Sequence, residues 1–253
     1  MPIADAADSP SNLTRVALIT GATAGIGLEI ARQLAAKGLK VIIGARDAER
    51  GQSLAKQLRA AGGDAASVQL DVTDPAAVLR AAIWVSGEIG RLDVLINNAG
   101  IARDQHKRPT ETTLQDLRET YETNVFGVAT VTNAFLPLLS NSRDGRIINQ
   151  SAGLGSHSLT ARMEPPLVRL NWLAYNSSKA ALNSITLEYA KLLRETSVRI
   201  VATSPGQVAT ALNDYRPGGV TPAEGAGVAV RLTTMSPPPP NGSLWGLAGQ
   251  LAW

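Results

Sequence analysis

Short apolar runs alternate with amphipathic stretches along the first half of the chain. Short runs rich in branched apolar side chains are typical of buried strands, and apolar residues three or four apart are typical of helices. The pattern predicts strands at residues 15–20, 40–44, 67–70 and 94–96, and helices at 28–37, 48–61 and 75–89. Strands that alternate with helices indicate a parallel sheet with right-handed crossovers.

The second half continues this alternation with longer helices. It predicts a helical region at 114–139 that bends near Gly127, a strand at 146–149, a helix at 174–194, a strand at 198–202, a helix from Thr221 to about Thr233 and an edge strand at 243–247. Together the elements predict an α/β fold class, with one doubly wound (Rossmann) parallel sheet in a single domain over residues 13–253. Residues 1–12, rich in Ala, Asp, Ser and Pro, are expected to form a flexible tail. The long irregular stretch at 153–173 is typical of a lid-like insertion.

The composition of the chain excludes several kinds of site. It has no cysteine and only two histidines, so no thiolate chemistry is possible and no metal site is expected. The net charge is +3 and the basic residues are scattered, so no nucleic-acid partner is expected. No apolar run reaches transmembrane length, and residues 1–12 lack the pattern of a signal peptide. These features favour a cytoplasmic protein that acts on a small molecule, without a membrane partner.

A glycine-rich turn, TGATAGIG at residues 20–27, joins the first predicted strand to the first predicted helix. In a doubly wound fold this turn binds the pyrophosphate of a dinucleotide. The first glycine permits the tight turn, and the two later ones let the backbone approach the phosphates at the helix N-terminus. The alternative is a turn that serves packing alone. Cofactor contacts are expected from Gly21, Thr23, Ala24, Gly25, Ile26 and Gly27.

The residues that follow the second predicted strand favour NADP(H) over NAD(H). In an NAD-binding fold, an acidic residue here would hold the ribose diol. This chain has Ala45 in that place, followed by Arg46. A guanidinium suits a 2′-phosphate, so we expect Arg46 to bind NADP(H). The alternative is a solvent-exposed loop arginine.

Three further segments lie where parallel strands are expected to end, at the sheet edge that binds the cofactor. The pair DV follows the third strand, NNAG follows the fourth, and SPGQVAT follows the sixth. From these segments we expect cofactor contacts by Asp71, Val72, Asn98, Ala99, Gly100, Pro205, Gly206, Val208 and Thr210.

The sequence YNSSK places Tyr175 and Lys179 four residues apart in a predicted helix. Residues at that spacing share one face, so the phenol and the ammonium can meet the same ligand. A nearby fixed cation favours the phenolate and lowers the pKa of a tyrosine. We therefore expect both residues beside the nucleotide, with Tyr175 as a proton donor whose pKa Lys179 lowers.

The order of these motifs resembles that of a classical short-chain dehydrogenase/reductase. TGATAGIG, DV, NNAG, Asn124, RIIN, YNSSK and SPGQVAT follow one another between residue 15 and about residue 233. The long gap before Tyr175 and the terminal Trp253 resemble the carbonyl-reductase-like branch. By this resemblance Tyr175 would be the general acid/base, Lys179 would hold the nicotinamide ribose, and Asn124 would position a proton-relay water. The resemblance implies an NADPH-dependent enzyme that reversibly reduces a ketone or aldehyde, and a monomer or weak dimer.

The chain departs from the family at the end of the fifth predicted strand. The family typically has Asn-x-Ser-Ser there, and its second serine binds the substrate carbonyl, whereas this chain has NQSA at 149–152. In the plain register Ala152 takes the place of that serine in the substrate pocket, and Ser151 points elsewhere. A one-residue bulge could turn Ser151 inward, or Ser156 could substitute. The alanine keeps two other functions open: a non-redox NADP-binding enzyme, such as an isomerase or dehydratase, and an NADP-binding regulator.

Four other side chains lie in loops outside these motifs. His157, Met163 and Trp172 lie in the irregular stretch, where they either contact substrate or pack beneath the lid. His106 lies in a charged loop, DQHKR, and is expected to be solvated.

Overall fold

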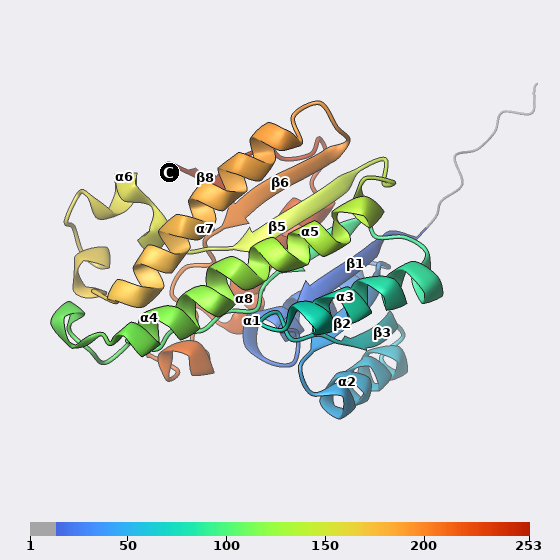
Figure 1. Ribbon diagram of the computed structural model, residues 1–253, viewed down its shortest axis with the longest axis horizontal. Helices are drawn as coiled ribbons and strands as arrows, with labels where there is room; N and C mark the ends of the chain where they lie inside the picture. Colours follow the sequence, from blue (N-terminus) through green and yellow to red (C-terminus); the bar gives the residue numbers. More distant parts are fainter. Residues whose placement is uncertain (1–13) are drawn as a thin grey trace, which may run out of the picture.

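The computed structural model describes residues 14–253, so the tail predicted at residues 1–12 lies outside the described residues. Over residues 14–253 a single eight-stranded sheet has the order β3-β2-β1-β4-β5-β6-β7-β8 (Figure 1). Neighbouring strands pair in parallel, except β7 with β8. The strands are β1 (Val16–Thr20), β2 (Lys40–Ala45), β3 (Asp64–Gln69), β4 (Val94–Asn97), β5 (Gly145–Gln150), β6 (Val198–Thr203), β7 (Leu244–Trp245) and β8 (Gln250–Leu251). The predicted doubly wound α/β fold is confirmed.

Helices cover both faces of the sheet (Figure 1). One face carries α1 (Gly25–Ala36), α2 (Ala48–Ala60) and α8 (Pro222–Thr234). The other carries α3 (Pro75–Trp84), α5 (Gly127–Leu139) and α7 (Leu173–Leu192), and α4 (Leu114–Tyr121) leads into α5. Among residues 14–253, none of these helices is both long and apolar enough to cross a membrane.

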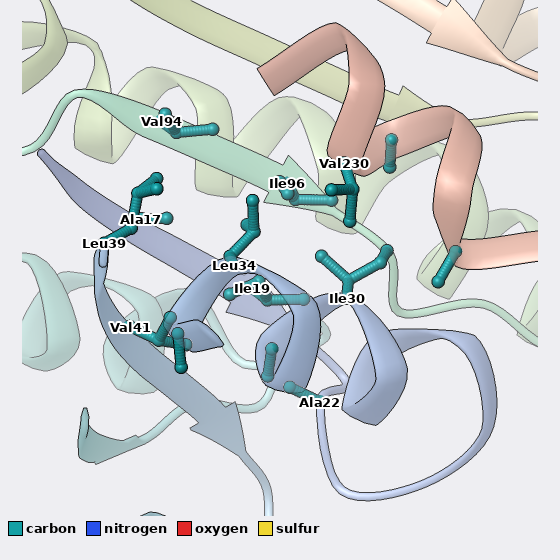
Figure 2. Packing of buried hydrophobic residues seen from close by; sticks show 14 of the residues in the cluster. Ala17, Ile19, Ala22, Ile30, Leu34, Leu39, Val41, Val94, Ile96 and Val230 are labelled. Atoms are coloured by element: carbon teal, nitrogen blue, oxygen red, sulfur yellow. The ribbon is translucent and has the colours of Figure 1, made fainter. Parts of the chain in front are cut away.

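Alternate side chains of each strand enter two separate apolar cores. On β1, Ile19 packs in the core formed with α1 and α8, which includes Leu34 and Val230 (Figure 2). Its neighbour Leu18 packs in the opposite core, with Phe135 of α5. Burial of each large apolar side chain stabilises the fold by roughly 1.5–3 kcal/mol. This two-sided packing explains why the central strands are continuous apolar runs rather than alternating ones.

Two regions of the sheet differ from the predicted pattern. Strand β3 begins at Asp64 instead of residue 67, because it pairs with β2 from Lys40 onward. Its sequence, DAASVQ, has too few branched apolar residues to show this in advance. At the other edge only Leu244–Trp245 of the predicted strand 243–247 is extended, and β8 pairs antiparallel with it. Strand β8 is two residues long, too short to produce a periodic signal.

The bend predicted near Gly127 takes the form of a π-helical turn, η3 (Glu122–Phe126), between α4 and α5. A Cβ atom on Gly127 would lie 2.8 Å from the carbonyl oxygen of Val72, so the close approach of these backbones requires glycine. The turn carries the fully buried Asn124. The irregular turn therefore brings a polar side chain to the carboxyl edge of the sheet. Single π-helical turns are frequently found at functional sites.

The insertion at 153–173 contains the helical turns η4 (Gly153–Gly155), α6 (His157–Thr160) and η5 (Leu167–Arg169). Its start is tied to the C-terminus, which lies beside α6 (Figure 1). The Ser156 hydroxyl donates a hydrogen bond to the carbonyl of Ala252 at 2.8 Å, and the Ser158 amide donates to that of Trp253 at 2.9 Å. These bonds fix one end of the insertion relative to the sheet.

Candidate active site

Three cavities that share lining residues follow the carboxyl edge of the sheet. We call them the inner groove, about 360 Å³, between the glycine turn and α7; the outer groove, about 590 Å³, beyond β2 and β3; and the apolar pocket, about 280 Å³, at the insertion. Predicted cofactor residues line the inner groove (Ala24, Gly25, Ile26, Gly27, Asn98, Ala99, Gly100, Tyr175, Lys179, Pro205, Thr210), the outer groove (Gly21, Thr23, Arg46, Asp71, Val72) and the apolar pocket (Gly206, Val208).

The glycine turn fits the phosphates of a dinucleotide. Gly21 and Gly25 have φ of 62° and 53°, in the left-handed region that glycine adopts at little cost. A Cβ atom on Gly27 would lie 2.4 Å from Nδ2 of Asn98, so no larger residue fits there. Helix α1 starts after Ala24 without a side-chain cap and without an acidic residue in its first turn. Its free N–H groups and positive dipole end therefore face the inner groove, as an anion requires.

The outer groove is lined by both basic and acidic side chains, among them Arg46 and Arg50 and the carboxylates of Asp47 and Asp71. The Arg50 guanidinium donates to the carbonyl of Thr23 at 3.1 Å, which holds it next to the glycine turn. Its backbone N–H donates to Asp47, the N-cap of α2. Arg46 was predicted from the sequence, but Arg50 was missed. It lies four residues further along, on the first turn of α2, where only the structure shows which way the side chain points.

A hydrogen-bond network joins the end of β4 to the glycine turn. The hydroxyl of Thr20 accepts hydrogen bonds from the backbone N–H groups of Asn98 and Ala99, both at 3.0 Å. The side-chain amide of Asn98 donates to the carbonyl of Thr20 at 2.9 Å. Thr20, the first residue of the glycine-rich turn, thus fixes the two strand ends between which the inner groove opens.

The start of α7 is held by a buried carboxylate. Asp104 is fully buried, and its two oxygens accept hydrogen bonds from the backbone N–H groups of Ala174, at 2.6 Å, and Tyr175, at 3.4 Å. Trp172, the formal N-cap, provides no capping side chain. Asp104 therefore replaces a local cap and fixes the helix turn that carries Tyr175. Sequence reasoning missed this residue because it lies 70 positions upstream.

Tyr175 and Lys179 lie together on one face of α7, as their spacing predicts. The Lys179 Nζ is 5.5 Å from the centroid of the Tyr175 ring and donates to the carbonyl of Gln150 at 2.6 Å. Burial raises the pKa of Tyr175 to about 12 and lowers the pKa of Lys179 to about 8. In this structure burial is the cause of the raised tyrosine pKa, so the lowering by the ammonium, expected for a closed, cofactor-lined site, stays a prediction.

Asn124 lines none of these cavities, although it lies close behind the inner groove. Its side-chain amide donates to the carbonyl of Ile101 at 2.8 Å, and its oxygen accepts from the N–H of the same residue at 2.9 Å. It also donates to the hydroxyl of Ser178 at 3.0 Å. A Cβ atom on Gly100 would lie 3.4 Å from Asn124 and 3.6 Å from Nζ of Lys179. Asn124 thus shapes the backbone beside Lys179.

Strand alternation continues without a bulge through the end of β5. The side chain of Ser151 turns toward α7, where its hydroxyl donates to Oδ1 of Asn183 at 2.5 Å. Ala152 lines the apolar pocket together with Tyr175. Ser156, considered above as a substitute, is fully buried against Ala252 and does not line that pocket. The structure therefore keeps regular strand alternation, with Ala152 at the place of the family's serine.

The apolar pocket has aromatic and aliphatic walls. Trp172 packs edge-on against Tyr175, with 5.7 Å between ring centroids, and Leu154, Leu170 and Leu212 complete this cluster. Trp172 is buried, whereas His157 and Met163 are exposed and do not line the pocket. Of the three candidate substrate contacts in the insertion, only Trp172 is placed to act as one.

His106 is exposed, as expected, but it has a partner. Its Nε2 lies 2.6 Å from a carboxylate oxygen of Asp214, in the segment that follows β6. The charged loop after β4 therefore touches the segment that borders the inner groove from the other side.

Comparison with known proteins agrees with this geometry. A family model described as short chain dehydrogenase matches residues 15–218. Short-chain dehydrogenase anuI of Penicillium roqueforti is 36% identical over 229 residues, which cover 87% of this chain and 89% of the relative. Among solved structures, NADPH-bound carbonyl reductase from chicken fatty liver has a TM-score of 0.81 and 32% identity, with 95% of this chain and 99% of the other covered. A metagenomic short-chain oxidoreductase in complex with NADP has a TM-score of 0.72 and 30% identity, with 88% and 91% covered.

The fold and the glycine turn define a doubly wound dinucleotide-binding protein, and the family match places it among oxidoreductases. The chain belongs to the short-chain dehydrogenase family, in its classical form, and its likeness to the chicken enzyme supports the carbonyl-reductase-like branch. The predicted NADP(H) cofactor is supported by the similar structures that hold NADPH or NADP.

Proposed function

We propose that this protein reduces an apolar ketone or aldehyde to an alcohol with NADPH, in a reversible reaction. One observation carries the proposal: Tyr175 lines both the inner groove and the apolar pocket. A proton donor therefore stands where a nucleotide cavity meets a cavity suited to an apolar molecule. Bound NADPH would supply the hydride for the carbonyl carbon.

Tyr175 would protonate the oxygen on which negative charge develops. Because burial raises its pKa to about 12, the phenol stays protonated at neutral pH and is ready to donate. Lys179, held by the carbonyl of Gln150, would bind the nicotinamide ribose and support the tyrosine. Asn124 would hold the backbone of Ile101 in place through its two hydrogen bonds to that residue. In this way it would position a proton-relay water.

Arg46 and Arg50 would give the site its preference for NADP(H). Both guanidinium groups line the outer groove, where a 2′-phosphate would lie, and Ala45 leaves no carboxylate at the strand end to repel it. Two guanidinium groups can bind one phosphate through several charge-assisted hydrogen bonds.

The apolar pocket would hold the body of the substrate. Apolar residues, with several leucines and Trp172 among them, provide most of its wall, so an aliphatic or cyclic ketone suits it better than a sugar or a charged metabolite. We further propose that residues 153–173 form a lid over this pocket and that the domain 13–253 acts as a monomer or weak dimer. Such a lid would cover part of the surface next to α7 through which many family tetramers pack.

The proposal is tested by NADPH oxidation with a panel of aliphatic, cyclic and aromatic ketones and aldehydes, with NADH in parallel. Turnover with NADPH and apolar carbonyl compounds is the expected result. Tight binding of NADPH without turnover of any member would overturn the reductase. That outcome would instead support the non-redox or regulatory functions that Ala152 keeps open.

A further inference from the structure

With alanine at position 152, the proposed reaction lacks one of the two usual hydrogen-bond donors to the carbonyl oxygen of the substrate. In the geometry described above, Tyr175 is one hydrogen-bond donor for a substrate oxygen, and the usual serine hydroxyl beside it is absent. Ser151 lines the inner groove, but its hydroxyl donates to Asn183, and the hydroxyl of Ser156 donates to the carbonyl of Ala252. Neither serine can therefore supply the second donor without a rearrangement of α7 or of the C-terminus.

Ser204 lines the apolar pocket immediately after β6. Its backbone N–H donates to the carbonyl of Trp245 at 2.7 Å, which fixes the residue in place. Its side chain is buried and lines the pocket together with Ala152 and Tyr175. Its hydroxyl oxygen accepts the backbone N–H of Gly153 at 2.9 Å, and Gly153 is the residue that follows Ala152. A hydroxyl oxygen thus stands one residue away from the position that lacks one.

The proton of this hydroxyl is free to serve a ligand. Among residues 14–253, no acceptor lies within hydrogen-bond range of the Ser204 hydroxyl as a donor. Other polar groups of the pocket are engaged: the Asn213 side chain accepts from the N–H of Thr210 at 3.1 Å, and that of Gln207 donates to Pro217 at 3.3 Å. Among the described residues, the indole N–H of Trp172 and the hydroxyl of Thr210 are the remaining competitors at this pocket.

We propose that Ser204 takes over the role of the missing serine and donates a hydrogen bond to the carbonyl oxygen of the substrate. This inference rests on the proposed reductase function. In the reaction the carbonyl carbon gains the hydride, its π electron pair moves to oxygen, and the Tyr175 proton passes to that oxygen. Ser204 keeps its proton and stabilises the developing negative charge, while its oxygen continues to accept the N–H of Gly153.

The experiment compares Ser204→Ala, Ala152→Ser and the double variant with the parent enzyme. Loss of one donor to a developing oxyanion commonly lowers kcat by ~10²–10³-fold, so Ser204→Ala should lower kcat by about that factor and change KM little. Adding Ala152→Ser to Ser204→Ala should raise kcat at least about tenfold above that of the Ser204→Ala single variant, because it returns a hydroxyl to the same pocket. Ser140→Ala, which removes an exposed hydroxyl bonded to its own helix, is the matched control. NADPH affinity and the thermal midpoint are measured for every variant.

Each outcome decides the role of Ser204. An unchanged kcat in Ser204→Ala overturns the proposal. A loss that Ala152→Ser does not restore, accompanied by a lower thermal midpoint, also overturns it, because Ser204 then serves only to hold Gly153. A comparable loss in Trp172→Phe with none in Ser204→Ala assigns the donor to the indole instead. A parent enzyme that turns over no carbonyl compound refutes the reductase function itself, before any variant is compared.

Discussion

The substitution Gly27→Ala tests how closely the backbone of the glycine turn packs against its neighbours at residue 27. The new Cβ atom would lie 2.4 Å from Nδ2 of Asn98, 2.7 Å from the carbonyl oxygen of Gly21 and 3.1 Å from Cα of Ala22. Two of these three neighbours belong to the backbone, so the turn must move and Asn98 must release its bond to Thr20. Overpacking of this kind costs typically about 1–3 kcal/mol of unfolding free energy.

Gly227→Ala is the matched control, since it introduces the same methyl group into another helix. Gly227 lies in α8, and a Cβ atom there would meet no atom within 4 Å. Alanine favours a helix interior over glycine by roughly 0.5–1 kcal/mol, so this variant should be slightly more stable than the parent. The two variants should therefore differ by about 1.5–4 kcal/mol, although they carry the same chemical change.

Urea denaturation and NADPH titration measure the two consequences separately. Gly27→Ala should unfold at lower urea concentration and bind NADPH at least about tenfold more weakly, which corresponds to about 1.4 kcal/mol. Gly227→Ala should keep the parental affinity. Equal stability and equal NADPH affinity of the two variants would refute the idea that backbone proximity at Gly27 builds the phosphate site.

Three further predictions concern the chemistry of the site. Tyr175→Phe should remove most turnover and leave the dissociation constant of NADPH nearly unchanged, as measured by fluorescence titration; full activity would show that another group donates the proton. Arg46→Ala should lose most of the preference for NADPH over NADH, and Arg50→Ala should lose part of it, measured as the ratio of the two kcat/KM values; equal ratios in parent and variants would contradict the assignment. Because the pKa of Lys179 is lowered to about 8, the reduction rate should fall above that pH. The unfolding free energy should rise between about pH 8 and pH 10, since the unfolded chain still binds the lysine proton there, and a flat profile would contradict the burial of Lys179.

The elements that the sequence predicted best are those with the strongest local signals. Strands β1, β2 and β4 are apolar runs buried on both faces, and the turn at 20–27 combines three glycines with a strand before it and a helix after it. Strand β3 was predicted too short because its extension depends on pairing with β2. Strand β8 was missed because two residues carry no period. In both cases tertiary pairing defines a strand that local propensity does not.

The residues of the candidate site also include some that a local pattern predicts and some that depend on tertiary contacts. Tyr175 and Lys179 could be predicted to share a face because helical spacing alone determines it. Asp104 could not, since its partners on α7 are 70 and 71 residues away and its carboxylate looks like any loop aspartate in the sequence. Helical spacing shows the cation beside Tyr175 but not the depth of burial, which raises the pKa of the tyrosine in this structure.

The position of Ala152 illustrates how far strand alternation can be relied upon. The structure keeps the plain register through residue 152, so Ser151 faces α7 and Ala152 faces the apolar pocket. What alternation could not show is that Ser204, just after the neighbouring strand β6, brings a hydroxyl to the N–H of Gly153. Contacts between the ends of neighbouring strands depend on the sheet order, which the sequence does not state.

The central claim is that hydride from NADPH reaches a carbonyl carbon held beside Tyr175. The most direct measurement uses NADPH deuterated at C4 of the nicotinamide, on the transferable side, with an apolar cyclic ketone, and analyses the product by mass spectrometry. We expect one deuterium on the carbinol carbon for each NADPH consumed, and loss of this product in Tyr175→Phe. Tight NADPH binding with no labelled alcohol from any apolar carbonyl compound would contradict the claim.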